Sequence, residues 1–234
     1  MEKVIQDDVD LRGLHLTELF DLSDVSIGGN FNCSKNDLTN LIGAPYQVCS
    51  FNCSSNQLTS LEGAPNIVLE DFICRDNHLT TLINSPKSVS VFFDCSHNRL
   101  TSLEGCTQKV TYFSCYDNNL TNLIGAPSIV REQFDCTNNK LTSLEGAPIT
   151  VGDTRFDGDE GLFDCSYNLL TNLKGAPITV YGSFVCLGNP ITSLEGLPKI
   201  IKGDLGLPEE IKGKFTTNYI RSLSKIVGKI IFTN

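Results

Sequence analysis

The sequence predicts a mainly β solenoid with few or no helices, in which short coils stack and share one parallel sheet. The first observation is a motif, F-x-C-x-x-N-x-L-T-x-L-x-G-x-P, that recurs eight times. The second is its period, because successive motif cysteines lie 20, 21, 21, 20, 21, 29 and 21 residues apart, which is the length of one solenoid turn. The third is that the apolar positions keep one frame in every copy. The motif cysteines are Cys33, Cys53, Cys74, Cys95, Cys115, Cys136, Cys165 and Cys186.

Each coil begins with a short strand, illustrated by the fifth copy. Side chains alternate across a strand, so Phe113 and Cys115 are expected to point inward and Ser114 outward. An asparagine, here Asn118, follows three residues after the cysteine in all eight copies. An amide has both donors and an acceptor. This side chain is therefore expected to form hydrogen bonds with backbone groups of the bend that have no partner in the sheet.

The second half of the coil turns back toward the next strand. Leu120 and Leu123 are expected to fill the interior, and Gly125 follows them. Seven copies have glycine at this position and one has Asn84, and these two residue types best tolerate positive φ. Ala-Pro follows in five copies, so the return path is expected to be extended and polyproline-like.

The repeats predict one domain over residues 1–234. Residues 1–30 form an N-terminal cap and a degenerate repeat, residues 31–202 hold the eight repeats, and residues 203–234 form a degenerate C-terminal cap. The two ends differ in charge: residues 1–30 hold two basic and seven acidic residues, and residues 199–234 hold seven basic and three acidic ones. Opposite ends of opposite sign favour head-to-tail association, although a monomer is the main expectation.

Composition limits the partners and the compartment. The net charge of −9 and the pI of about 4.8 argue against nucleic acid and anionic membrane as partners. No apolar stretch is long enough to cross a bilayer, and the acidic N-terminus does not resemble a signal peptide, so a cytoplasmic location is expected. Cysteines at one repeat position indicate buried, reduced thiols. Cys49 and Cys106 lie outside this pattern and are the candidates for a reactive pair, while Cys49 and Cys53 form a weak C-x3-C signal.

The repeat unit resembles the leucine-rich repeat. Residues 139–148, N-K-L-T-S-L-E-G-A-P, are similar to the short 20–21-residue type of bacterial effectors and to arrays carried in tailed-phage genomes. The resemblance covers about residues 9–232 and implies a right-handed solenoid whose concave sheet binds a protein partner. Two departures are that Phe and Cys stand at strand positions usually filled by Leu, and that no catalytic domain follows the repeats, which removes the ubiquitin-ligase activity of some bacterial relatives.

The outward positions of the strands, and of the bends that follow them, are not constrained by packing in the core. The residue types found there therefore indicate how the surface functions. The first two repeats carry Asn, Ser and a single charged residue, Lys35, there, whereas repeats three to seven carry aromatic and charged residues of the types that anchor interfaces. The predicted partner-binding residues are Arg75, Asp76, His78, Asp94, His97, Arg99, Tyr112, Tyr116, Asp117, Asp135 and Tyr167. The alternative is a solvated sheet face with incidental aromatics.

No metal or cofactor is expected. His78 and His97 lie one rung apart, but the cysteines face the opposite side of the strands, and two histidines with Asp94 are a poor zinc set. The sixth link is eight residues longer than the others, and its residues 152–161 include four carboxylates whose spacing matches no calcium loop. This insertion is read as a rim bulge that adds partner contacts, with a flexible solvated loop as the alternative.

The sequence therefore favours a non-enzymatic binding module, an inhibitor or adaptor that acts on a bacterial host protein if the chain is of phage origin. A structural or self-assembling component, such as a virion or filament part, is the second hypothesis. An enzyme is the third and least favoured, because no nucleophile–base pair, phosphate loop or metal signature is recognised.

Overall fold

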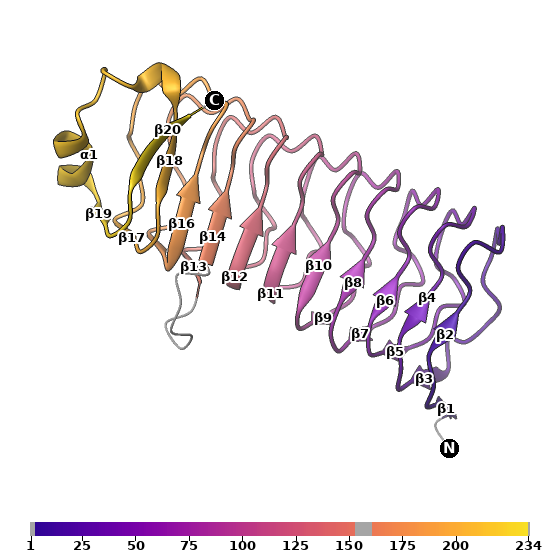
Figure 1. Ribbon diagram of the computed structural model, residues 1–234. Helices are drawn as coiled ribbons and strands as arrows, with labels where there is room; N and C mark the ends of the chain where they lie inside the picture. The colour runs from indigo at the N-terminus through magenta and orange to yellow at the C-terminus, as the bar shows by residue number, and fades with distance from the viewer. Residues whose placement is uncertain (1–2, 153–160, 234) are drawn as a thin grey trace.

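The computed structural model describes residues 3–152 and 161–233, which form a continuous stack of coils running from the N-terminus to the C-terminus (Figure 1). Within these residues each of eleven coils contributes one strand to a parallel arrangement that we call the main sheet. Its strands are β2 (Val9–Asp10), β4 (Phe31–Asn32), β6 (Phe51–Asn52), β8 (Phe72–Ile73), β10 (Phe92–Asp94), β11 (Lys109–Ser114), β12 (Ile129–Asp135), β14 (Gly161–Asp164), β16 (Gly182–Val185), β18 (Leu205–Pro208) and β20 (Ile230–Thr233). The predicted mainly β solenoid is confirmed.

A second row of strands precedes the main sheet in each coil. It contains β1 (Lys3–Ile5), β3 (Val25–Ile27), β5 (Gln47–Val48), β7 (Ile67–Val68), β9 (Ser88–Val89), β13 (Thr150–Val151), β15 (Thr179–Val180), β17 (Ile200–Ile201) and β19 (Lys225–Ile226). Strands β11 and β12 are long enough to belong to both rows, so they join the later part of this row to the main sheet. The expectation of a single sheet therefore needs one correction: a buried valine or isoleucine anchors a second ladder at the coil's corner.

The register keeps like residues side by side in the core. The motif phenylalanines pair rung to rung, as Phe31 does with Phe51 and Phe93 with Phe113. Their ring centroids lie 5.1–6.0 Å apart along the stack, within the range of favourable aromatic contact. The two leucines of each repeat, the first of which is replaced by Ile191 in the eighth, are also buried. A lone coil could not cover this apolar surface, so neighbouring coils stabilise one another.

The motif cysteines are free and fully buried, as the sequence predicts. Burial raises the pKa of the Cys33 thiol to about 12 and raises the pKa of the Cys95 thiol well above its ordinary value. The Sγ atom of Cys95 lies 3.3 Å from the carbonyl oxygen of Ser114 on the next rung, to which it donates. These thiols therefore act as small, inert core residues.

The asparagine of each motif ties three segments of backbone together. The side chain of Asn118 accepts from the Leu100 N–H at 2.8 Å and donates to the carbonyl oxygens of Cys95 and Cys115 at 3.1 Å each. Because Cys115 O also accepts from Asn139 on the following coil, every amide links its own bend to the preceding coil. The prediction that this residue pairs a bend's backbone is confirmed, and the pairing extends across rungs.

Two left-handed positions shape each coil. The predicted one is confirmed, with φ of 91° at Gly125 and 70° at Asn84. The second lies immediately before the motif asparagine, where non-glycine residues adopt φ of 51–56° in seven coils, for example 51° at His97 and 54° at Asp117. This left-handed residue reverses the chain direction at the end of the strand and brings the amide over the cysteine carbonyl.

The C-terminal coil departs from the repeat. After β18 the chain forms a 3-10 turn, η1 (Glu209–Ile211), and one short helix, α1 (Thr217–Leu223), before β19 and β20. Thr216 caps α1 by accepting from the Tyr219 N–H at 3.2 Å. Within the described ranges, neither helical segment could span a membrane. Residues 153–160, which contain most of the acidic insertion, lie outside the described residues.

Candidate functional site

The outward side chains of the main sheet change character along the stack. On β4 and β6 the residue after the motif phenylalanine is Asn32 or Asn52, and its Oδ1 atom accepts from the N–H two residues later at 3.0 Å. This turn satisfies the backbone where the strand ends. The first two repeats therefore present small polar groups that are already engaged within their own coil.

Aspartates make the same turn further along the sheet. Asp94 accepts from both the N–H and the hydroxyl of Ser96, at 3.0 and 2.5 Å, and is only 4% exposed. Asp135 and Asp164 accept from the N–H two residues on, at 2.9 Å each. Sequence reasoning assigned Asp94 and Asp135 to binding alone, whereas the structure also gives each a local role at the strand end.

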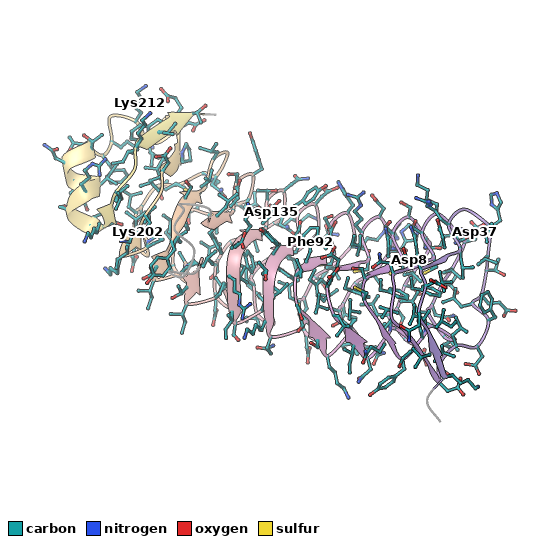
Figure 2. The ribbon with its side chains drawn as sticks, turned by 60° about the horizontal axis from the view of Figure 1, so that its bottom comes forward. Asp8, Asp37, Phe92, Asp135, Lys202 and Lys212 are labelled. Carbon is teal, nitrogen blue, oxygen red and sulfur yellow. The ribbon has the colours of Figure 1, made fainter. Side chains whose placement is uncertain are left out.

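A hollow of about 580 Å³ opens on the main sheet over β8, β10, β11 and β12. Figure 2 places Phe92 and Asp135 near the middle of the stack, between Asp37 toward the N-terminal end and Lys212 at the C-terminal end. The lining residues are Asp71, Arg75, Val91, Phe92, Asp94, Tyr112, Phe113, Ser114, Tyr116, Gln133 and Asp135. The structure thus brings together Arg75, Asp94, Tyr112, Tyr116 and Asp135 from the predicted set.

Aromatic side chains form one wall of the hollow. Phe92 and Tyr112 are register partners on β10 and β11, and their rings meet edge to face with centroids 6.4 Å apart. The Tyr112 hydroxyl donates to the Glu132 carboxylate on the next coil. Phe92, Val91, Asp71 and Gln133 were missed in the sequence. A check of the position before each motif phenylalanine would have found all but Val91, because that position also faces outward.

A hydrogen-bonded cluster holds Tyr116 at the rim of the hollow. The Nε2 atom of His97 lies 2.7 Å from the Tyr116 hydroxyl, and its Nδ1 atom lies 2.5 Å from a carboxylate oxygen of Asp117. The other Asp117 oxygen accepts from the Asn138 side chain at 2.7 Å. The left-handed backbone before each motif asparagine aligns these side chains on adjacent coils. This cluster fixes the orientation of the Tyr116 ring before any partner arrives.

The remaining predicted residues lie away from the hollow. Asp76 approaches Arg75, with 3.7 Å between a carboxylate oxygen and Nε, so it touches the site only through that ion pair. His78 and Arg99 follow the motif asparagines, are exposed, and do not line the hollow. Tyr167 lies on a later coil, 55% exposed.

The described residues offer no group of three or more histidine, cysteine or acidic side chains that could hold a metal ion.

The prediction that Cys49 and Cys106 form a reactive pair needs correction. Cys106 is buried, and that burial raises the pKa of its thiol, so it resembles the motif thiols. Cys49 is the one partly exposed thiol, and burial together with Glu70 and Asp71 raises its pKa. A thiol with a raised pKa is a poor nucleophile.

Stacked coils of about 21 residues, with buried leucines and a hydrogen-bonded asparagine in each, define a leucine-rich repeat solenoid. A solved structure similar to this chain is that of the leucine-rich repeat protein YopM from Yersinia enterocolitica WA-314, with 22% sequence identity and a TM-score of 0.58. The similarity covers 78% of this chain and 39% of that of YopM, so the chain spans well under half of YopM and the likeness is one of fold. No protein-family model and no curated protein matches the chain.

Proposed function

We propose that the protein is a non-enzymatic binding scaffold whose main sheet face, the face expected to be concave, engages a protein partner. One observation carries the proposal: the hollow lies where the engaged Asn and Ser side chains of the first coils give way to aromatic and charged ones. Solenoids present a continuous sheet surface of this kind for binding. The leucine-rich repeat fold supports a protein as the partner.

Tyr112 and Tyr116 are the proposed anchors. Tyrosine offers a large contact area at a low cost in side-chain entropy, and anchors are most effective when they are already oriented. Tyr112 is held by its bond to Glu132 and by the ring of Phe92, and Tyr116 is held by His97. The other predicted residues, His78, Arg99 and Tyr167 among them, are proposed to make peripheral contacts.

The biological setting follows from the resemblance of the repeats to tailed-phage arrays. We propose that the partner is a bacterial protein, that the encounter takes place in the host cytoplasm, and that the chain acts as an inhibitor or adaptor. The net charge of −9 supports a protein rather than nucleic acid or an anionic membrane as the partner.

The test is affinity capture from a bacterial lysate, followed by measurement of the affinity for any stoichiometric partner. A variant with Tyr112→Ala and Tyr116→Ala is expected to lose the partner by at least about tenfold in Kd. Tyr46→Ala is the matched control, because Tyr46 is 48% exposed but does not line the hollow. Unchanged affinity in the double variant, with loss in the Tyr46 variant, would place the binding surface elsewhere.

A second candidate function is end-to-end self-assembly. Strands β2 and β20 are the outermost strands of the same parallel sheet, each paired on one side only within the described residues. The terminal segments carry opposite net charge, −5 for residues 1–30 and +4 for residues 199–234, counting Lys and Arg against Asp and Glu. Light scattering of the pure protein decides this candidate: growth of the particle with concentration, reduced by salt, supports it, and a constant monomer mass rejects it.

A further inference from the structure

We propose that the hollow on the main sheet receives an arginine or lysine side chain from a basic segment of the partner. The proposal rests on the proposed function, since it specifies the chemistry of the partner that the main sheet face engages. Three features of the hollow and its surroundings support it: an excess of carboxylates over cations, an aromatic wall, and carboxylates that form no ion pair with a lysine or arginine among the described residues.

The charge of the surface is negative where the hollow lies. The residues that line the hollow include three carboxylates and one cation, a formal charge of −2. These carboxylates are Asp71, Asp94 and Asp135, and a fourth, Asp164, lies beside Asp135 on the adjacent strand β14. The cation is Arg75, which already faces Asp76. A surface of this sign attracts a basic partner and repels an acidic one.

No lysine or arginine in the described part of the chain forms an ion pair with any of these four carboxylates. Asp135 and Asp164 are direct register partners on β12 and β14, so two like charges lie on adjacent strands. Burial, with a smaller contribution from Asp135, raises the pKa of the Asp164 carboxyl. A cation from a partner would relieve this repulsion.

The aromatic wall suits the same ligand. A guanidinium or ammonium group is attracted to the face of an aromatic ring, and guanidinium also stacks on it. Phe92, Tyr112 and Tyr116 supply three rings around the hollow, beside Asp94 and Asp135. The aliphatic stem of an arginine or lysine can pack on Val91 and Phe92 while its charged end reaches the carboxylates.

The first two repeats show which substitution removes the negative charge of these aspartates and keeps the strand-end turn. Asn32 and Asn52 make the same strand-end turn as Asp94, Asp135 and Asp164. A triple variant, Asp94→Asn, Asp135→Asn and Asp164→Asn, therefore keeps the acceptor of each turn and removes three negative charges. A matched control removes three charges elsewhere: Glu62→Gln, Glu104→Gln and Glu145→Gln change exposed residues of the return path that do not line the hollow.

The experiment measures fluorescence anisotropy of labelled glycine–serine peptides that carry arginine, citrulline or glutamate at the same positions. The full chain is expected to bind the arginine peptide at least about tenfold more tightly than the citrulline peptide, and less tightly as salt increases. The triple aspartate variant and Tyr112→Ala are each expected to weaken arginine binding by about fivefold or more, and the triple glutamate variant by less than about twofold.

Equal binding of arginine and citrulline peptides, an equal loss in both triple variants, or no binding of the arginine peptide would overturn the proposal. These failures are separable from failure of the proposed function. If the Tyr112 and Tyr116 double variant loses a partner captured from lysate while the triple aspartate variant keeps it, the sheet face binds a protein but not through a basic side chain.

Discussion

Replacing Asn118 with alanine is expected to destabilise the protein by about 3 kcal/mol, although the side chain touches no other side chain through its hydrogen bonds. The Leu100 N–H donates to Asn118 Oδ1 alone, so the variant leaves one buried donor without a partner. A buried unpaired group costs about 1–3 kcal/mol. The carbonyl oxygens of Cys95 and Cys115 lose one bond each but keep those from Asn98 and Asn139, which adds about 0.5–1 kcal/mol apiece.

The assay is urea unfolding followed by circular dichroism, with Asn119→Ala as the control. Asn119 is the next residue and is half-buried, and among the described residues its side chain makes no hydrogen bond. The control is expected to change the free energy of unfolding by less than about 0.5 kcal/mol. Equal effects of the two substitutions would refute the assignment of the asparagine as the link between coils. Asn118→Asp is expected to be at least as harmful at neutral pH, because it removes both donors and adds a charge beside two carbonyl oxygens.

Three further predictions concern the core, the turn and the sheet surface. In the native protein a thiol-specific reagent is expected to modify at most Cys49, and after denaturation all 10 cysteines, because the other nine are buried. Gly146→Ala is expected to cost at least about 3 kcal/mol, since φ is 92° and a Cβ atom would lie 2.4 Å from backbone atoms of Leu123 and Ile124. Asp164→Asn is expected to raise Tm at neutral pH and to reduce the loss of stability as pH rises from acid, because burial raises the pKa of this carboxyl in the folded state.

Each of these predictions has a control or a contrary result. Rapid modification of several thiols without denaturant would contradict the buried cysteine row. Gly213→Ala is the control for the turn, because φ is 87° there but no atom lies within 4 Å of the added Cβ, so only the backbone cost of about 1–2 kcal/mol remains. For Asp164 the sign is fixed: a raised pKa favours the protonated form in the fold, so stability falls as pH rises through the interval between the unfolded and folded pKa values. A lower Tm for the asparagine variant at neutral pH would contradict it.

The repeat period and the inward positions could be predicted because every coil must bury side chains at the same positions. Phe113, Cys115, Leu120 and Leu123 are buried as expected, and Gly125 adopts positive φ. The second row of strands could not be predicted, since its two-residue strands differ from a connection only in pairing with neighbouring coils. The left-handed residue before each asparagine was also missed. Asp, Asn, His or Gly, the types that favour positive φ, stand there in five of eight repeats, but Lys35, Ser55 and Tyr167 break the pattern.

The candidate site was predicted in part. Tyr112, Tyr116 and Arg75 were found because aromatic and basic residues stand out against Asn and Ser on the outer face. The turn made by Asp94 was missed. The sequence does not distinguish an aspartate whose carboxylate accepts a hydrogen bond from the backbone from one that is free to bind a partner. The hydrogen bond between His97 and Tyr116 joins two neighbouring coils, so the sequence of a single coil does not reveal it.

Site-specific photo-crosslinking shows directly whether the partner binds at the hollow. A benzophenone amino acid is placed at position 112, on the wall of the hollow, or at position 124, where the natural Ile124 is 54% exposed and does not line the hollow. A covalent adduct with the captured partner is expected from position 112, suppressed by an excess of the arginine peptide, and none is expected from position 124. An adduct from position 124 with none from position 112 would contradict it.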